Sequence, residues 1–120
     1  MTSPFRDRLA RAATSAAEAG IDALLITPGA DLRYLVDYQA LPLERLTCLL
    51  VPASGEPLLV VPALEQHAAE ASGATDHVAF TTHGETDDAY RIVADQVRER
   101  LGGVPRSIGV SDRMWAQQVL

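Results

Sequence analysis

The side chains best suited to chemistry are three histidines, and they lie far apart in the sequence. His67 falls in a predicted helix, His77 opens a predicted strand and His83 sits in a predicted acidic loop. A metal site needs such ligands to converge, often through spacings such as HExxH or CxxC, and neither motif occurs. The sequence therefore predicts a helix-surface, a strand-end and a loop histidine, and no metal ligands.

The candidate nucleophiles also have simpler interpretations. Cys48 lies inside the apolar run 46–51, which favours a small buried side chain over an activated thiol. Ser111 follows a predicted strand in GVSDR, where a helix cap is the simpler interpretation, and no G-x-S-x-G motif occurs. TPGADLR offers one glycine, a weak signal for phosphate binding. We therefore expect no catalytic residue and no cofactor site in this chain.

A polar loop gathers the remaining candidates, within DLRYLVDYQALPLERLTCLLVP (31–52). Tyr38 could present an amphipathic ring, and Arg45 has a guanidinium fork able to bind a carboxylate. The alternative is structural: Tyr34 is then a packed residue, and Arg45 pairs on the surface with Glu44 or Asp37.

Composition restricts the classes of function. The chain has 120 residues, 48% of them hydrophobic, which suits one domain with one core. Its net charge is -6 and all ten basic residues are arginine, so no basic stripe is available for nucleic acid. No apolar run approaches the roughly 20 residues that span a bilayer. The N-terminus lacks a secretory pattern and the single cysteine suits a reducing compartment, so we expect a soluble cytoplasmic protein.

Apolar periodicity predicts the elements that position these residues. Helices are expected over 5–19, GADLRYL (29–35), 63–71, 88–101 and from Ser111 or Asp112 onward. Strands are expected over 21–27, 46–51, 57–61, 77–81 and 107–111, the second and third forming an antiparallel hairpin around PASGE. This order predicts a single α/β domain with a mixed five-stranded sheet and helices on both faces.

Helix ends carry further predictions. Asp31 is a candidate cap for the second helix, and Thr86 or Asp87 for the helix over 88–101. The last helix has apolar Met114, Trp115 and Val119 but no stop signal before the chain ends. We therefore expect a fragment of a longer polypeptide, the alternative being a frayed natural terminus.

The order of GIDALLI, DLRYLVDY, ERLTCLLVPASGEPLLVVPALE and IGVSDRMWAQQVL resembles the N-terminal domain of the creatinase, prolidase and aminopeptidase P superfamily. The most specific pieces are DLRYL (31–35), similar to the family's Asn/Asp-x-Arg-Tyr-Leu segment, and Glu44-Arg45 before the first hairpin strand. The resemblance covers almost the whole chain, is strongest to bacterial Xaa-Pro peptidases, and implies a ribonuclease H-like α/β fold.

The resemblance also implies a function. In that family a C-terminal pita-bread domain binds two divalent metal ions, such as Mn, Co or Zn, through two Asp, one His and two Glu. None of these ligands can be placed on residues 1–120, which are then a non-catalytic N-terminal domain of a Xaa-Pro peptidase acting on proline-containing peptides. Its implied partners are its own catalytic domain and a second copy in a homodimer. The loop 37–45, with Asp37, Tyr38 and Arg45, would narrow the partner's active-site entrance.

One position departs from the family pattern. Relatives commonly have glycine where this chain has Asp37, a position suited to positive φ that Asp tolerates better than most residues. Two alternatives to the peptidase hypothesis stay open: a free-standing ligand-binding or regulatory α/β module, and the N-terminal domain of a creatinase-like amidinohydrolase.

Overall fold

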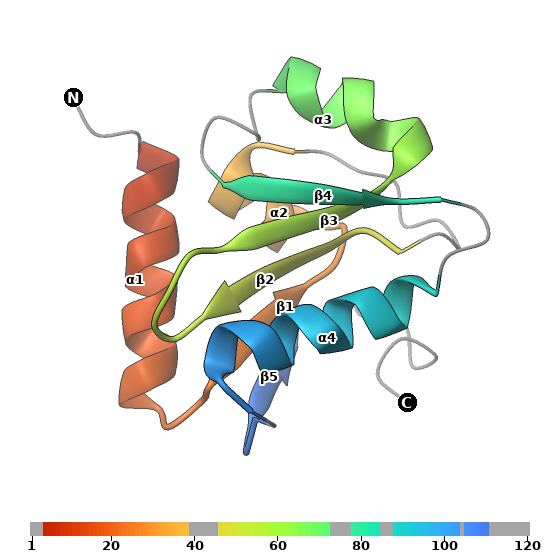
Figure 1. Ribbon diagram of the computed structural model, residues 1–120. Helices are drawn as coiled ribbons and strands as arrows, with labels where there is room; N and C mark the ends of the chain where they lie inside the picture. Colours follow the sequence, from red (N-terminus) through yellow and green to blue (C-terminus); the bar gives the residue numbers. More distant parts are fainter. Residues whose placement is uncertain (1–3, 39–45, 73–77, 85–87, 104, 111–120) are drawn as a thin grey trace.

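A mixed five-stranded sheet, with helices on both faces, organises the chain (Figure 1). This computed structural model describes residues 4–38, 46–72, 78–84, 88–103 and 105–110. The strand order is β4-β3-β2-β1-β5, in which β2 pairs antiparallel with β1 and β3, and the two outer pairs are parallel. The predicted fold class and the predicted hairpin are therefore confirmed.

The elements agree with the expected order. The helices are α1 (Pro4–Glu18), α2 (Ala30–Val36), the 3-10 turn η1 (Ala63–Glu65), α3 (Gln66–Ser72) and α4 (Ala89–Leu101). The strands are β1 (Ala23–Ile26), β2 (Cys48–Pro52), β3 (Leu58–Pro62), β4 (Ala79–His83) and β5 (Ile108–Val110). Among the described residues, no helix combines the length and apolarity needed to cross a membrane.

The hairpin strands β2 and β3 are apolar on both sides, and all ten of their residues are buried. Successive side chains of a strand point to opposite faces, so each strand contributes to two cores. Leu49 and Val51 join the cluster under α1 and α2, whereas Cys48 and Leu50 join the cluster under α4. Such strands require a helical layer on each face, which Figure 1 shows with α1 and α4 on opposite sides of the sheet.

The first and last strands are joined at their starts by polar contacts. The backbone N–H of Arg106 donates to Asp22 Oδ2 at 2.7 Å, and the N–H of Asp22 donates to the carbonyl of Ser107 at 3.1 Å. The Ser107 hydroxyl donates to the carbonyl of Gly20 at 2.8 Å. These bonds connect residues more than 80 positions apart in sequence and fix β5 beside β1.

Several predicted boundaries are corrected. The cap of α4 is Asp88, whose Oδ1 accepts from the N–H of Arg91 at 3.2 Å, rather than Thr86 or Asp87. The N-cap of α2 is Gly29, which has no side chain to make a cap bond. Asp31 is not the cap, because it already lies inside the first turn. The fourth strand runs two residues later than expected and includes His83. The helix expected from Ser111 lies outside the described residues.

Asp37 ends α2 in the left-handed conformation, with φ 60° and ψ 35°, and its N–H donates to the carbonyl of Arg33 at 2.9 Å. It is the single non-glycine residue with positive φ in the described part of the chain. The expectation that this position needs positive φ is therefore confirmed. Aspartate supports this conformation, which a Cβ-branched side chain does not.

We expect Asp37→Val to lower the free energy of unfolding by about 1–2 kcal/mol, since a branched Cβ clashes with its own backbone at positive φ. Asp37→Asn is the matched control and should stay within about 0.5 kcal/mol of the unsubstituted chain, because Asn also tolerates this conformation. Urea unfolding followed by circular dichroism measures both. Equal stabilities for the Val and Asn variants would contradict this account.

Candidate functional site

The residue that opens the candidate loop is anchored in the core. Tyr38 is only 3% exposed and packs in the cluster under α1 and α2. Its hydroxyl donates to Glu65 Oε2 at 3.3 Å, at the end of η1. The ring proposed to reach a substrate is thus buried in this structure, and its one polar atom is directed to Glu65.

This contact changes the acidity of the phenol. Burial raises the pKa of Tyr38 from 10.0 to about 12, and the negative charge of Glu65 and the hydrogen bond to it act in the same direction. The hydroxyl therefore stays protonated and donating over the whole neutral range. It acts as a fixed hydrogen-bond donor here and has no basicity to offer a reaction at neutral pH.

The residue that follows the loop is anchored as well. The carbonyl of Leu46 accepts a hydrogen bond from Nε2 of His83 at 2.7 Å, so the ring carries its proton on that nitrogen. His83 is buried at the end of β4, which corrects the expected exposed loop position. Sequence reasoning missed this role because β4 begins and ends two residues later than expected, which places His83 within the strand.

Both anchors lie at one edge of the sheet. In the parallel pair of β3 and β4, Pro62 is in register with His83, and η1 with Glu65 begins directly after Pro62. The carboxyl ends of parallel strands meet at the same edge, which places Glu65 and His83 there together. Tyr38 belongs to one core cluster and Leu46 to the other, so the two anchors pack on opposite faces of the sheet.

Tyr34 was expected to be packed, and this prediction is wrong. Its side chain is 52% exposed at the surface where α1 meets α2. The guanidinium of Arg8 lies 4.3 Å from the centre of the Tyr34 ring and 5.0 Å from that of Phe5, and Arg8 Nη1 donates to the carbonyl of Tyr34 at 3.0 Å. The ring thus pairs with a cation at the surface, an arrangement that helical spacing did not predict.

The remaining candidates are either exposed or outside the described residues. Asp37 is exposed, and His67 is exposed on α3. Arg45, Glu44 and His77 lie outside the described residues. Within the described ranges no group of three or more His, Cys, Asp or Glu side chains could hold a metal ion.

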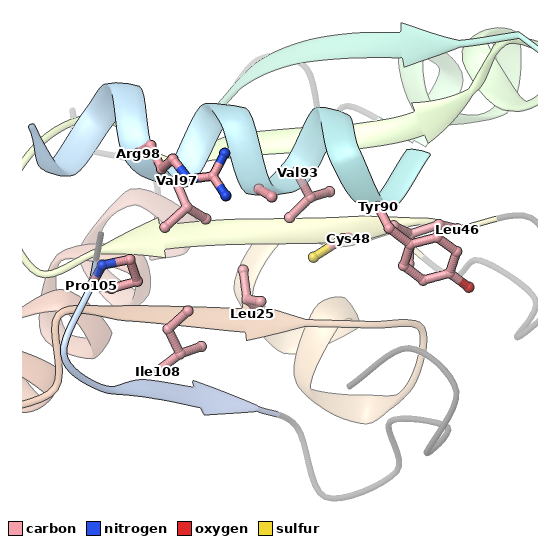
Figure 2. A pocket seen from close by; sticks show the side chains of 10 residues that line it. Leu25, Leu46, Cys48, Tyr90, Val93, Val97, Arg98, Pro105 and Ile108 are labelled. Atoms are coloured by element: carbon pink, nitrogen blue, oxygen red, sulfur yellow. The ribbon is translucent and has the colours of Figure 1, made fainter. Parts of the chain in front are cut away.

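Cys48 has the predicted role of a small buried residue. It is 1% exposed in the cluster beneath α4, and Figure 2 shows its sulfur between that helix and the neighbouring strand β1. Burial raises the pKa of the thiol to about 12, although a backbone hydrogen bond at Ile26 acts against the shift. A thiol that stays protonated is a poor nucleophile, so Cys48 is structural.

Together the fold and the site define a small α/β domain that carries a doubly anchored loop and, among its described residues, no catalytic constellation. The chain belongs to the creatinase/prolidase N-terminal domain family, whose model matches residues 8–119. The family expected from the ordered segments is therefore confirmed, and with it the fold.

Known dipeptidases are similar to the chain over almost its full length. Probable dipeptidase PepE of Mycobacterium bovis and that of Mycobacterium tuberculosis are each 41% identical over 119 residues, which are 97% of this chain and 30% of theirs. The crystal structure of dipeptidase PepE from Mycobacterium ulcerans is 43% identical and superimposes with a TM-score of 0.84, covering 94% of this chain and 30% of that one.

A separately determined domain shows the same fold. The N-terminal domain of Xaa-Pro dipeptidase from Lactobacillus brevis superimposes with a TM-score of 0.83 at 17% identity, covering 93% of this chain and 82% of that one. The chain thus spans less than a third of the mycobacterial relatives but most of this isolated domain.

The Tyr38 contact predicts a specific response to pH. We expect Tyr38→Phe to lower the free energy of unfolding by about 1 kcal/mol at neutral pH, because the bond to Glu65 is lost while the ring still packs. A raised pKa in the folded state stabilises the fold below pH 10.0, and this contribution is lost as the pH rises toward about 12. As the pH rises from 10.0 to about 12, the Tyr38→Phe variant should therefore lose less stability than the unsubstituted chain.

Chemical unfolding at a series of neutral to alkaline pH values measures this difference. Tyr90→Phe is the matched control, since Tyr90 is 41% exposed on α4 and its loss should leave the profile unchanged. Identical alkaline profiles for Tyr38→Phe and Tyr90→Phe would show that the Tyr38 phenol is not held in its protonated form.

Proposed function

We propose that this chain is the non-catalytic N-terminal domain of a Xaa-Pro dipeptidase or aminopeptidase. One observation carries the proposal. The chain matches the model of the creatinase/prolidase N-terminal domain and is similar to probable dipeptidases, yet it spans only 30% of their length. The relatives are dipeptidases, which favours a peptidase over the creatinase-like amidinohydrolase as the parent activity. Hydrolysis of proline-containing peptides then belongs to a C-terminal pita-bread domain outside this chain.

The metal chemistry belongs to that second domain in our proposal. Two divalent ions, such as Mn, Co or Zn, would activate water there. The described residues of this chain do not fit such a pair, because their carboxylates, imidazoles and thiol form no group of three. The contribution of this domain is therefore to shape and restrict the approach to the site. We place the parent in the cytoplasm.

The decisive experiment compares residues 1–120 with the parent enzyme. We expect purified residues 1–120 to show no metal-dependent cleavage of Xaa-Pro dipeptides with added Mn²⁺, Co²⁺ or Zn²⁺, whereas the parent cleaves them. Circular dichroism of the same sample supplies the control that the domain is folded. Robust cleavage by the folded domain would overturn the proposal.

We further propose that the loop 37–45 restricts the active-site entrance of the partner subunit in a homodimer. Its flanks support this role, because Tyr38 is fixed to Glu65 and Leu46 to His83 at one edge of the sheet. A segment held at both ends projects from a defined place, which steric selection between peptides requires. Asp37 sets the direction in which the chain leaves α2, and Arg45 supplies the group for a substrate carboxylate.

This role predicts a change in selectivity. In the parent enzyme, Arg45→Ala should reduce kcat/KM for a Xaa-Pro dipeptide by about tenfold, equivalent to one lost charge-assisted contact, and affect a longer Xaa-Pro peptide less. Arg91→Ala is the matched control, since Arg91 is exposed on α4. Sedimentation velocity should show a dimer for all three proteins. An unchanged ratio between the two substrates, or a monomeric parent, would contradict the loop's role.

A further inference from the structure

The strand β4 has a partner strand on one side only. It stands first in the sheet order β4-β3-β2-β1-β5, and all five of its residues are in register with β3. Figure 1 shows it at the margin of the sheet. In an edge strand, alternate N–H and C=O groups point away from the sheet. The outer edge of β4 therefore presents backbone donors and acceptors that none of the described strands uses.

The helix that connects β3 to β4 covers a face of the sheet rather than this edge. Ala69 of α3 is buried in the cluster under α1 and α2, and α3 packs against β3. Phe80 of β4 packs against the same cluster. Along β4, Ala79 is exposed, and Thr81 and Thr82 are half-buried. Within the described residues, the edge of β4 is thus open to a further strand.

The sequence of β4 lacks the features by which proteins usually protect a sheet edge. Protected edges carry charged side chains, proline or a bulge, or are very short. β4 reads AFTTH, without Asp, Glu, Lys, Arg or proline, and its register with β3 is continuous over five residues. β5, at the opposite edge, has only three residues and follows Pro105 and Arg106. Of the two edges, β4 is the one suited to pairing.

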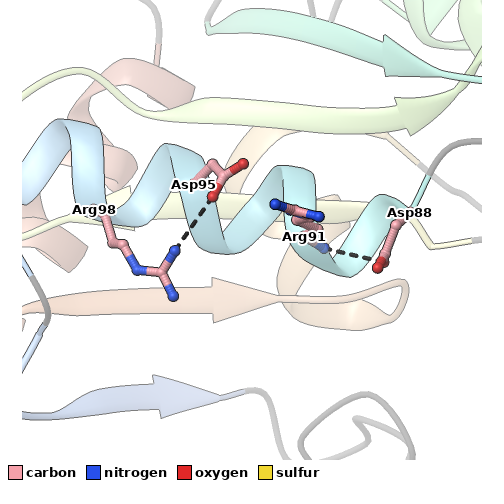
Figure 3. Close-up of polar contacts among 4 residues, drawn as sticks. All are labelled: Asp88, Arg91, Asp95 and Arg98. Carbon is pink, nitrogen blue, oxygen red and sulfur yellow. Dashed lines mark hydrogen bonds and ion pairs between the residues drawn. The ribbon is translucent and has the colours of Figure 1, made fainter.

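The solvent-facing side of α4 is built differently. It is lined by charged side chains, which are Asp88, Arg91, Asp95 and Arg98 (Figure 3). Arg98 Nη1 donates to Asp95 Oδ1 at 3.3 Å, and both side chains are 58% exposed. β4 has an aromatic residue and two β-branched residues instead, which favour strand pairing. Its edge is therefore better suited to another strand than to solvent.

A second copy of β4 fits this edge in the antiparallel orientation. A two-fold axis at Thr81 pairs all five residues, and any other centre pairs fewer of them. Thr81 then faces the partner's Thr81, and Phe80 faces the partner's Thr82. Ala79 faces the partner's His83. Aromatic residues opposite β-branched residues, and threonine opposite threonine, stabilise antiparallel pairs. No like charges oppose each other, so the strand is complementary to itself.

We propose that two copies of this domain associate by antiparallel pairing of their β4 strands, which joins two five-stranded sheets into one. The contact is isologous, so it closes as a dimer. A second copy is favoured over a free peptide because its strand is already held in a sheet and loses less conformational entropy on pairing. One strand pair is small beside a standard interface of about 1,600 Å², so the isolated domain should dimerise weakly. The inference rests on the proposed homodimer and names its contact surface.

Cross-linking tests the register directly. In Thr81→Cys the two introduced thiols face each other at the axis, where opposed Cβ atoms lie about 4.5–5.5 Å apart. We expect oxidised glutathione to convert this variant to a covalent dimer at least tenfold faster than Ala79→Cys. Ala79→Cys is the matched control on the same side of the same strand, because its two copies lie about 14 Å apart, too far for a disulfide. Cys48 is buried and unchanged in both variants.

Charge substitutions test the same contact without a covalent bond. Thr81→Lys and Thr81→Glu should each raise the dimer Kd at least tenfold, because like charges then oppose each other at the axis. An equimolar mixture of the two variants should recover dimerisation, since opposite charges then meet. Thr14→Lys is the control, as Thr14 is exposed on α1. Sedimentation velocity over a range of concentrations measures association, and circular dichroism verifies folding.

Three results would overturn the proposal. Equal cross-linking rates for Thr81→Cys and Ala79→Cys would show that the strands do not pair about Thr81. A dimer that survives Thr81→Lys as well as Thr14→Lys would place the contact on another surface and leave the proposed homodimer intact. A domain that stays monomeric at millimolar concentration would leave the edge to an extended peptide, and a monomeric parent enzyme would contradict the homodimer as well.

Discussion

The sheet buries apolar side chains on both of its faces, and the rest of the structure depends on this requirement. Alternation along β2 and β3 sends neighbouring residues into two separate clusters, so neither face can be left to solvent. The helices α1 and α2 cover one face and α4 covers part of the other. The candidate loop joins Tyr38, in one cluster, to Leu46, in the other. The position of the loop is thus a consequence of how the core is divided.

Periodicity in the sequence was sufficient to predict the elements, because strand and helix patterns follow from local geometry. The apolar runs around PASGE predicted the hairpin, whereas the αL position of Asp37 was expected from the family resemblance, because relatives commonly have glycine there. The two tyrosines were assigned the wrong way round, since Tyr34 is exposed and Tyr38 is buried. Their burial depends on where α1 and η1 pack relative to α2, and local sequence patterns do not specify this packing. His83 was misplaced for the same reason, as its partner is the distant carbonyl of Leu46.

The two buried side chains with raised pKa values, Tyr38 and Cys48, act as parts of the scaffold. The phenol of Tyr38 and the thiol of Cys48 both have a pKa raised to about 12 by burial, so both stay neutral at physiological pH. Groups in this state serve packing and hydrogen bonding. A domain of this kind can be joined to another domain without introducing competing reactive groups, which fits the longer relatives of which the chain spans 30%.

The paired anchors at Tyr38 and Leu46 have a consequence for how such domains diversify. Both contacts are made by residues outside the segment 39–45, so its sequence can change without disturbing either contact. Closing a longer loop between fixed ends is inexpensive, since each doubling in length costs only about 0.6 kcal/mol. The segment is therefore a natural position for insertion, where new selectivity can evolve, or be grafted by design, on an unchanged framework.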